Sequence, residues 1–116
     1  MKESLTQQQT EKLLALGVSK DKASIKEDMY GPALFTLTDL LKLLPSTLEV
    51  GDDRYIFKIE GDENGEDYWV SYYHYTFHEG SAIPLSLWAG AEPELIDALY
   101  RAVVWYYGFF LVALKK

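Results

Sequence analysis

The clearest structural signal in the sequence is the pair Asn64 and Gly65, which lies between two segments whose side chains alternate with a period of two. A type I′ turn needs a positive φ at both of its central residues, and Asn followed by Gly meets this requirement at low cost. The sequence therefore predicts a β-hairpin closed at Asn64 and Gly65. We expect its two strands to contain residues 54–60 and residues 68–76.

The turn also fixes which residues of the hairpin lie opposite each other. Pairing residues whose numbers sum to 129 sets Ile59 opposite Val70, Phe57 opposite Tyr72 and Tyr55 opposite His74, all on one face. The opposite face then carries a second set of side chains: Ile56, Lys58, Glu60, Trp69, Ser71, Tyr73 and Tyr75.

Two helices are expected before the hairpin. The first spans residues 6–16, with Gly17 as its left-handed stop and Val18 placed to contact Leu13 in a Schellman closure. The second spans residues 37–44 and begins at a capping box formed by Thr36 and Asp39. Pro45 ends this helix. Its leucines recur at helical spacing on one side, which predicts a packed face: Leu37, Leu40, Leu41 and Leu44.

A third strand and a last helix are expected after the hairpin. Residues 83–88 alternate again, but Pro84 confines them to a sheet edge, and Gly90 is expected to end the strand. The helix is expected to cover residues 93–107. A stop at Gly108 would make residues 109–114 a further strand or an apolar tail, and the sequence leaves open whether these residues are helix, strand or interface tail. Its inward stripe is Leu95, Leu99, Ala102, Tyr106 and Phe109, widened by Ile96, Val103 and Phe110. An arc this wide indicates a helix that is sandwiched or that meets another molecule.

These elements predict a single α+β domain over residues 1–116. A small antiparallel sheet of three or four strands, built on the central hairpin, would carry helices on one face. The helices at residues 37–44 and 93–107 are expected to cover the face that bears Tyr55, Phe57, Ile59, Val70 and Tyr72.

Composition excludes several classes of function. The formal net charge is −7, which disfavours binding of duplex nucleic acid. The absence of Cys excludes disulfides, thiolate metal sites and thiol nucleophiles. The first ten residues have no apolar core that could serve as a signal peptide, so we expect a cytoplasmic protein. Residues 98–114 contain Arg101 and three Tyr, which makes a membrane span unlikely.

The order of these motifs resembles a known group of proteins. A helix ends in Leu16-Gly17, the segment Leu34 to Pro45 reads LFTLTDLLKLLP, a Tyr-rich hairpin follows, and the run from Asp97 to Trp105 reads DALYRAVVW. The whole pattern resembles small, functionally unassigned proteins encoded by phages, prophages and other mobile elements of gut anaerobic bacteria. Phe35 stands where Trp is common in that group, and residues 109–114 replace a more usual polar ending. The resemblance implies no catalytic residue.

Three side chains form the sharpest chemical candidate: His74, His78 and Glu79. Two His with three residues between them suit one metal ion when they lie a helical turn apart. On a strand they would be separated by roughly 13 Å, which is too far for one zinc ion. A structural role for His74 is therefore favoured, and we predict no catalytic residue, metal or cofactor. A small hydrolase or metal-binding enzyme centred on these three residues remains the alternative.

Two surfaces suggest binding. Eight acids lie between Glu49 and Asp67, which leaves an acidic mimic of nucleic acid as a second alternative. The aromatic second face of the hairpin is the stronger lead, because the predicted helices can cover only one side of a small sheet. Contiguous exposed aromatic side chains mark partner sites. We predict a non-catalytic protein-binding module, whose partner is another protein or a second copy, with these contact residues: Ile56, Trp69, Tyr73 and Tyr75.

Overall fold

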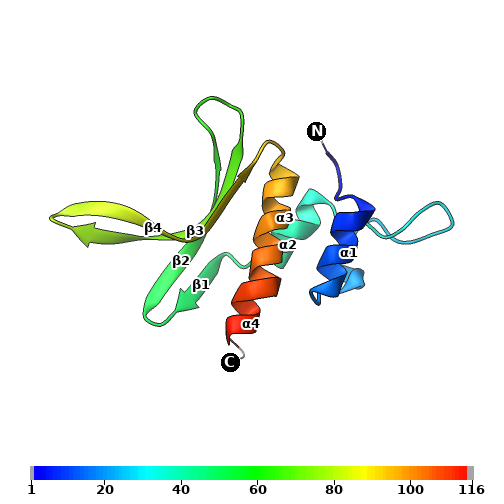
Figure 1. Cartoon of the computed structure of the whole chain (residues 1–116), viewed down its shortest axis with the longest axis horizontal. Helices are drawn as coiled ribbons and strands as arrows, with labels where there is room; N and C mark the ends of the chain where they lie inside the picture. The colour runs from blue at the N-terminus through cyan, green and yellow to red at the C-terminus, as the bar shows by residue number, and fades with distance from the viewer. Residues whose placement is uncertain (1, 115–116) are drawn as a thin grey trace.

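The computed structural model describes residues 2–114, apart from the side chain of His78, and has the predicted α+β architecture (Figure 1). Helix α1 (Gln7–Ala15), the 3-10 turn η1 (Lys20–Lys22) and helix α2 (Leu37–Leu43) precede the sheet. The four antiparallel strands lie in chain order: β1 (Thr47–Val50), β2 (Asp53–Gly61), β3 (Tyr68–His78) and β4 (Ser81–Glu92). A long helix follows, made of α3 (Leu95–Trp105), the π-helical turn η2 (Tyr106–Phe110) and α4 (Leu111–Leu114).

The predicted register of the central hairpin is confirmed as far as the pair Ile56–Tyr73, where β2 and β3 stop pairing, so the predicted pair Tyr55–His74 is not part of the ladder. The predicted turn is wrong. β2 and β3 pair Ile59 with Val70 and Phe57 with Tyr72, each summing to 129. Gly65 has φ +71°, whereas Asn64 does not have a positive φ, so a two-residue type I′ turn is not formed. Instead, the amide of Gly65 donates to the carbonyl of Asp62 at 2.9 Å, which closes a turn around Glu63 and Asn64. Gly65 then supplies the left-handed residue that returns the chain.

The hairpin between β3 and β4 closes with a type I′ turn, the turn type that the sequence predicted at Asn64 and Gly65. His78 pairs with Ser81, and the two residues between them, Glu79 and Gly80, have φ values of 51° and 82°. Two consecutive positive φ values are the type I′ requirement. β4 forms a sheet edge, as Pro84 predicts, but it continues through Gly90 to Glu92, so the expected strand end at Gly90 is wrong.

The two N-terminal helices begin and end as the sequence predicts. Thr36 and Asp39 exchange both hydrogen bonds of a capping box. Gly17 has φ +102°, and the amide of Val18 donates to the carbonyl of Leu13 at 3.1 Å, which is the long bond of a Schellman motif.

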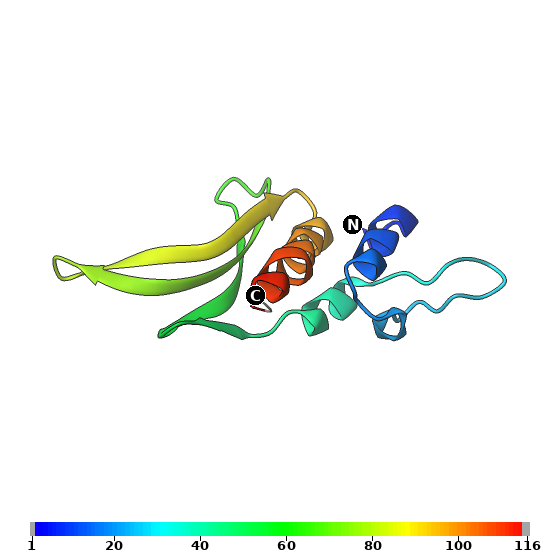
Figure 2. The same cartoon turned by 60° about the horizontal axis from the view of Figure 1, so that its bottom comes forward.

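Helix α3 lies between the sheet on one side and helices α1 and α2 on the other (Figures 1 and 2). The expectation that α2 would lie on the sheet is corrected, because α2 packs mainly on α3. The wide apolar arc of α3 is explained by this position, since it has to face two layers. The side chains that α3 buries are Ile96, Ala98, Leu99, Ala102 and Val103.

The last helix does not stop at Gly108. A π-helical turn carries the backbone through this glycine, where an added Cβ would lie 3.4 Å from the side chain of Leu16. A π turn holds more residues than an α turn, and it therefore changes which side chains face inward. Phe109, expected in the inward stripe, is 66% exposed, and Phe110 instead stacks on Tyr106 with ring centroids 5.6 Å apart. Of the alternatives left open for residues 109–114, the helix is the one that forms.

The sheet divides into two hairpins that diverge beyond the pair Ile56–Tyr73 (Figures 1 and 2). β2 leaves β3 there and pairs only with β1, while β3 continues with β4 as a two-stranded ribbon. We call residues 74–85 the arm. The arm and the loop between η1 and α2 project from opposite ends of the protein (Figure 1), which has extents of 61 × 40 × 17 Å and a radius of gyration of 15.8 Å, against about 13 Å for a compact domain of this length.

Candidate functional site

The face of the sheet opposite α3, here the outer face, carries three of the predicted contact residues as one cluster. Ile56 pairs across the strands with Tyr73, and the rings of Tyr73 and Tyr75 meet edge to face with centroids 5.3 Å apart. Ile56 is 46% exposed and Tyr75 51%, whereas Tyr73 is half-buried between its neighbours. The described chain places no helix over this face.

Trp69 lies apart from this cluster. It is exposed on the same face but pairs with Glu60 beside the turn between β2 and β3. The pair Lys58–Ser71 separates it from Tyr73. The outer face therefore presents one apolar cluster and one isolated indole, rather than a single set of four.

Phe77 extends the cluster and was missed because the strand was expected to end at residue 76. It lies on the same face as Tyr73 and Tyr75, since strand side chains alternate, and it is 77% exposed. The period-two run Tyr73, Tyr75, Phe77 was the signal that could have found it.

The charged groups on the outer face are compensated. The ammonium of Lys58 lies 3.1 Å from the carboxylate of Glu60 and 4.9 Å from the ring centroid of Tyr73. The hydrogen bond to Glu60 raises the pKa of Lys58. A partner that covers the cluster would thus meet the ion pair of Lys58 and Glu60 at the border of the cluster, and it would not have to bury an unpaired charge of Lys58.

The opposite side of the arm is also apolar. Ile83 and Leu85, which pair with Thr76 and His74, are about half exposed. At the base of the arm His74 meets Tyr55 edge to face with centroids 4.6 Å apart. Its Nε2 atom is sealed from solvent and has no hydrogen-bond partner in the described chain. This environment matches the structural role favoured for His74.

The candidate metal or hydrolase site is not assembled by the described residues. His74 lies at the base of the arm and Glu79 at its tip, so roughly 16 Å of extended strand separates them. The side chain of His78 lies outside the described residues. Among the side chains that are described, no three His, Asp or Glu gather in a way that could hold a metal ion.

The acidic residues between Glu49 and Asp67 occupy two separate turns. One group lies around Gly51 between β1 and β2, and the other lies in the turn after Gly61. The nine residues of β2 place these turns roughly 30 Å apart. They do not form one acidic surface of the kind that a nucleic-acid mimic requires.

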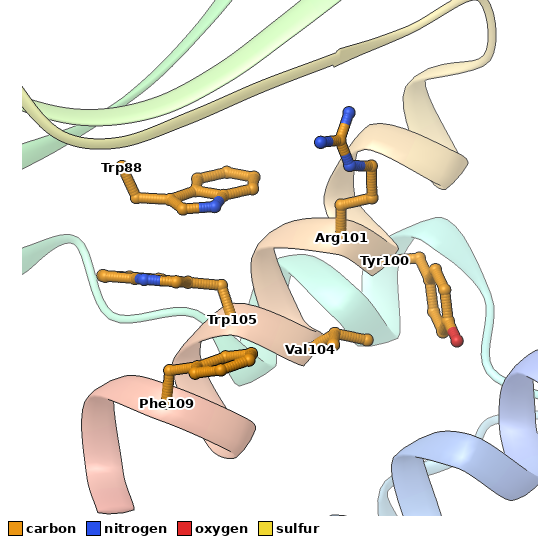
Figure 3. Close-up of a pocket in the computed structure, with 6 residues that line it drawn as sticks. All are labelled: Trp88, Tyr100, Arg101, Val104, Trp105 and Phe109. Atoms are coloured by element: carbon orange, nitrogen blue, oxygen red, sulfur yellow. The ribbon is translucent and has the colours of Figure 1, made fainter. Parts of the chain in front are cut away.

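A hollow of about 230 Å³ lies between β4 and the C-terminal helix (Figure 3). The indoles of Trp88 and Trp105 stack at 5.7 Å, and Val104 and Phe109 line the same space. Arg101 at its rim donates to the carbonyl of Ala91 at 3.0 Å and lies 3.6 Å from Glu92. The guanidinium is therefore already engaged, and the lining offers apolar contact rather than acid–base chemistry. The hollow was not predicted because it joins segments that are distant in sequence.

Gly90 shapes this hollow, and we predict that Gly90→Ala will destabilise the protein. An added Cβ would lie 2.8 Å from the Trp88 ring, so the stack on Trp105 would have to shift. Overpacking by one methyl group in a packed region costs about 2 kcal/mol. Chemical denaturation measures the loss, and near-ultraviolet circular dichroism reports the displaced indole. Gly61→Ala is the control, because a Cβ there would meet no atom within 4 Å. An unchanged tryptophan spectrum in Gly90→Ala would contradict the prediction.

Among the described residues, the helix from Leu95 to Leu114 is long and apolar enough to cross a membrane. Its first half forms the centre of the core, between the sheet and the other helices. A core helix passes the same test of length and composition, so the expectations of a cytoplasmic protein without a membrane span stay predictions.

No family model, curated protein or solved structure matches the chain. The resemblance to phage and prophage proteins therefore also stays a prediction.

Proposed function

We propose that the protein is a non-catalytic protein-binding module whose contact surface is the cluster Ile56, Tyr73, Tyr75 and Phe77. The observation that carries this proposal is a row of adjoining aromatic side chains on a sheet face that no helix of the described chain covers. Exposed aromatic clusters with few charges are typical of partner sites. The predicted residue Trp69 is assigned to the rim, because a polar pair separates it from the cluster.

The partner that fits this surface is a protein with an apolar patch of its own. The exposed side chains of the cluster are uncharged and the chain carries a formal net charge of −7, so the surface offers no positive charge to neutralise nucleic-acid phosphates and no ion pairs to a strongly charged partner. Tyr and Phe supply large contact area at low cost in side-chain entropy.

The double variant Ile56→Ser/Tyr75→Ser tests the proposal. Both side chains are about half exposed, so the variant should remain folded, with a loss of stability of about 1 kcal/mol. Immobilised wild-type protein and variants are incubated with extract of the producing cells. We expect a protein retained by wild type to be lost from the double variant.

The matched control is Tyr30→Ser, which removes an almost fully exposed aromatic side chain from the loop between η1 and α2. This control should retain the same protein as wild type. The proposal fails if the double variant unfolds, or if it captures everything that wild type captures. Trp69→Ser, measured in parallel, should weaken capture only slightly.

A further inference from the structure

The two edges of the arm differ in how well they are protected from pairing with another strand. On the β4 edge, Pro84 lacks an amide proton within the arm. Just beyond the arm on the same edge, Leu87 is displaced by a bulge and Arg101 occupies the carbonyl of Ala91. Proline, bulges and covering side chains are the devices by which natural sheets block edge-to-edge association. This edge is therefore closed to a further strand along much of its length.

Among the side chains that the structure describes, the β3 edge of the arm has none of these devices. β2 stops pairing with β3 at Tyr73, and in the described chain no other strand takes its place along residues 74–78. The central segment Tyr75-Thr76-Phe77 contains no proline or charge and consists of strong strand formers. Because the two hairpins diverge at this point (Figure 2), the unpaired backbone faces open space.

This segment is complementary to a second copy of itself. In an antiparallel pair centred on Thr76, the two Thr76 residues lie opposite each other. Tyr75 of each chain then lies opposite Phe77 of the other chain, on the same face. Thr–Thr and aromatic–aromatic cross-strand pairs are among the favourable combinations in sheets.

Charge and surface area agree with such a pairing. The sequence of the arm contains one Asp, Glu, Lys or Arg, which is Glu79. Two arms can therefore approach with little electrostatic repulsion, although each chain has a formal net charge of −7. The protein exposes 7585 Å², about 1,100 Å² more than a compact monomer of its mass. Part of this excess lies on the arm, where large apolar side chains are about half exposed or more: Tyr75, Phe77, Ile83 and Leu85. The rest lies on other segments, such as the loop that carries Tyr30.

We propose that the protein forms a two-fold symmetric dimer in which the β3 edges of the two arms pair around Thr76. The product is a continuous four-stranded ribbon in the order β4, β3, β3, β4. This inference rests on the proposed function and names its partner as a second copy of the chain. Because each free β3 edge is used once and the β4 edges are protected, the assembly closes at two chains instead of growing into a filament.

Sedimentation velocity over a range of concentrations tests the dimer. Wild-type protein should sediment with a mass about twice 13.3 kDa. Thr76→Lys should be monomeric, because it sets two like charges opposite each other at the symmetry axis. Thr76 is exposed, so this variant should keep its circular dichroism spectrum. Tyr30→Lys, on the loop drawn at the opposite end of Figure 1, should remain dimeric.

The absence of cysteine allows a direct test of the register. Thr76→Cys should form an intermolecular disulfide under mild oxidation, since directly opposed residues of an antiparallel pair lie within disulfide range. Phe77→Cys should cross-link less, because its partner position is Tyr75. Tyr30→Cys is the exposed control and should remain mostly uncross-linked.

Three results would overturn this inference: a monomeric wild type at all concentrations, a dimer that survives Thr76→Lys, or cross-linking of Tyr30→Cys as efficient as that of Thr76→Cys. A monomeric wild type from which Ile56→Ser/Tyr75→Ser still removes a captured protein would overturn the dimer and leave the proposed function standing. If the arm pairs as inferred but the double variant loses no partner, the proposed outer-face surface is wrong.

Discussion

Replacing Tyr72 with alanine is expected to lower the free energy of unfolding by about 3–5 kcal/mol, which is a large share of the stability of a domain of this size. Tyr72 is fully buried at the centre of the sheet. Its ring lies 5.4 Å from that of Phe57 and 5.8 Å from that of Trp105, and so joins the sheet to the C-terminal helix. Circular dichroism during urea titration measures the loss. Tyr68→Ala is the control, because this tyrosine of the same strand is exposed.

The conservative variant Tyr72→Phe separates packing from hydrogen bonding. The Tyr72 hydroxyl donates to the carbonyl of Pro45 at 2.7 Å, and its loss should cost only about 1–1.5 kcal/mol. Burial raises the pKa of Tyr72 well above its usual value of 10. The unfolded chain therefore releases this proton first as the pH rises, and wild-type stability should fall above pH 10. Tyr72→Phe should lose less stability in that range; an equal loss would contradict this assignment.

Asp39→Ala should cost about 3 kcal/mol, although it changes a short surface helix. The buried carboxylate of Asp39 accepts hydrogen bonds from the backbone amides of Thr36 at 2.9 Å and Ser24 at 2.7 Å, and from the Ser24 hydroxyl. It therefore caps α2 and also fixes the preceding loop to it. Removing it leaves donors without partners in a partly buried site. Thr38→Ala, an exposed change on the same helix, should cost less than 0.5 kcal/mol, roughly the usual surface effect.

The contribution of Asp39 should depend on pH. Burial alone would raise the pKa of Asp39, but the hydrogen bonds from Ser24 and Thr36 outweigh burial and hold the pKa below 3.8. The folded state thus binds the proton less tightly than the unfolded chain. The stabilisation is complete above about pH 5 and is lost as the pH falls below 4. The stability difference between wild type and Asp39→Asn should shrink over that range, and a constant difference would contradict the assignment.

The hairpin register could be predicted because it does not depend on the exact turn. The amide of Asp62 donates to the carbonyl of Asp67 at 2.9 Å, so the observed loop is residues 63–66 and is centred on the peptide bond between Asn64 and Gly65. A two-residue turn at Asn64 and Gly65 has the same centre, so both give residue pairs whose numbers sum to 129. Side-chain alternation then decides which face is buried. The capping box of Thr36 and Asp39 and the Schellman motif at Gly17 were equally readable, since each depends on residues close to one end of a helix.

The features that could not be predicted depend on contacts between distant segments. The last helix passes Gly108 close to the side chain of Leu16, the residue that follows α1. β1 was missed because it is only four residues long, although the Gly51-Asp52 turn after it was a readable signal. The division of the sheet into two hairpins follows from β2 changing partners at Ile56 and from the bulge beside Tyr73, which no local pattern reveals.

The candidate surface was only partly readable for the same reason. Period-two alternation places Ile56, Tyr73 and Tyr75 on one face. The sequence does not show that these side chains are exposed, that Trp69 lies apart from them, or that the cluster extends to Phe77. These properties depend on where the helices and the arm lie.

The central position of α3 has a consequence for synthesis of the chain. The sheet and the two N-terminal helices both complete their apolar packing against a helix that begins only at Leu95. During translation, about ninety residues therefore emerge before the element that joins the two layers exists. Nascent chains with exposed strands at this stage are prone to pair with one another. We expect the ribosome-bound chain to depend on chaperones until residues 95–103 have left the exit tunnel.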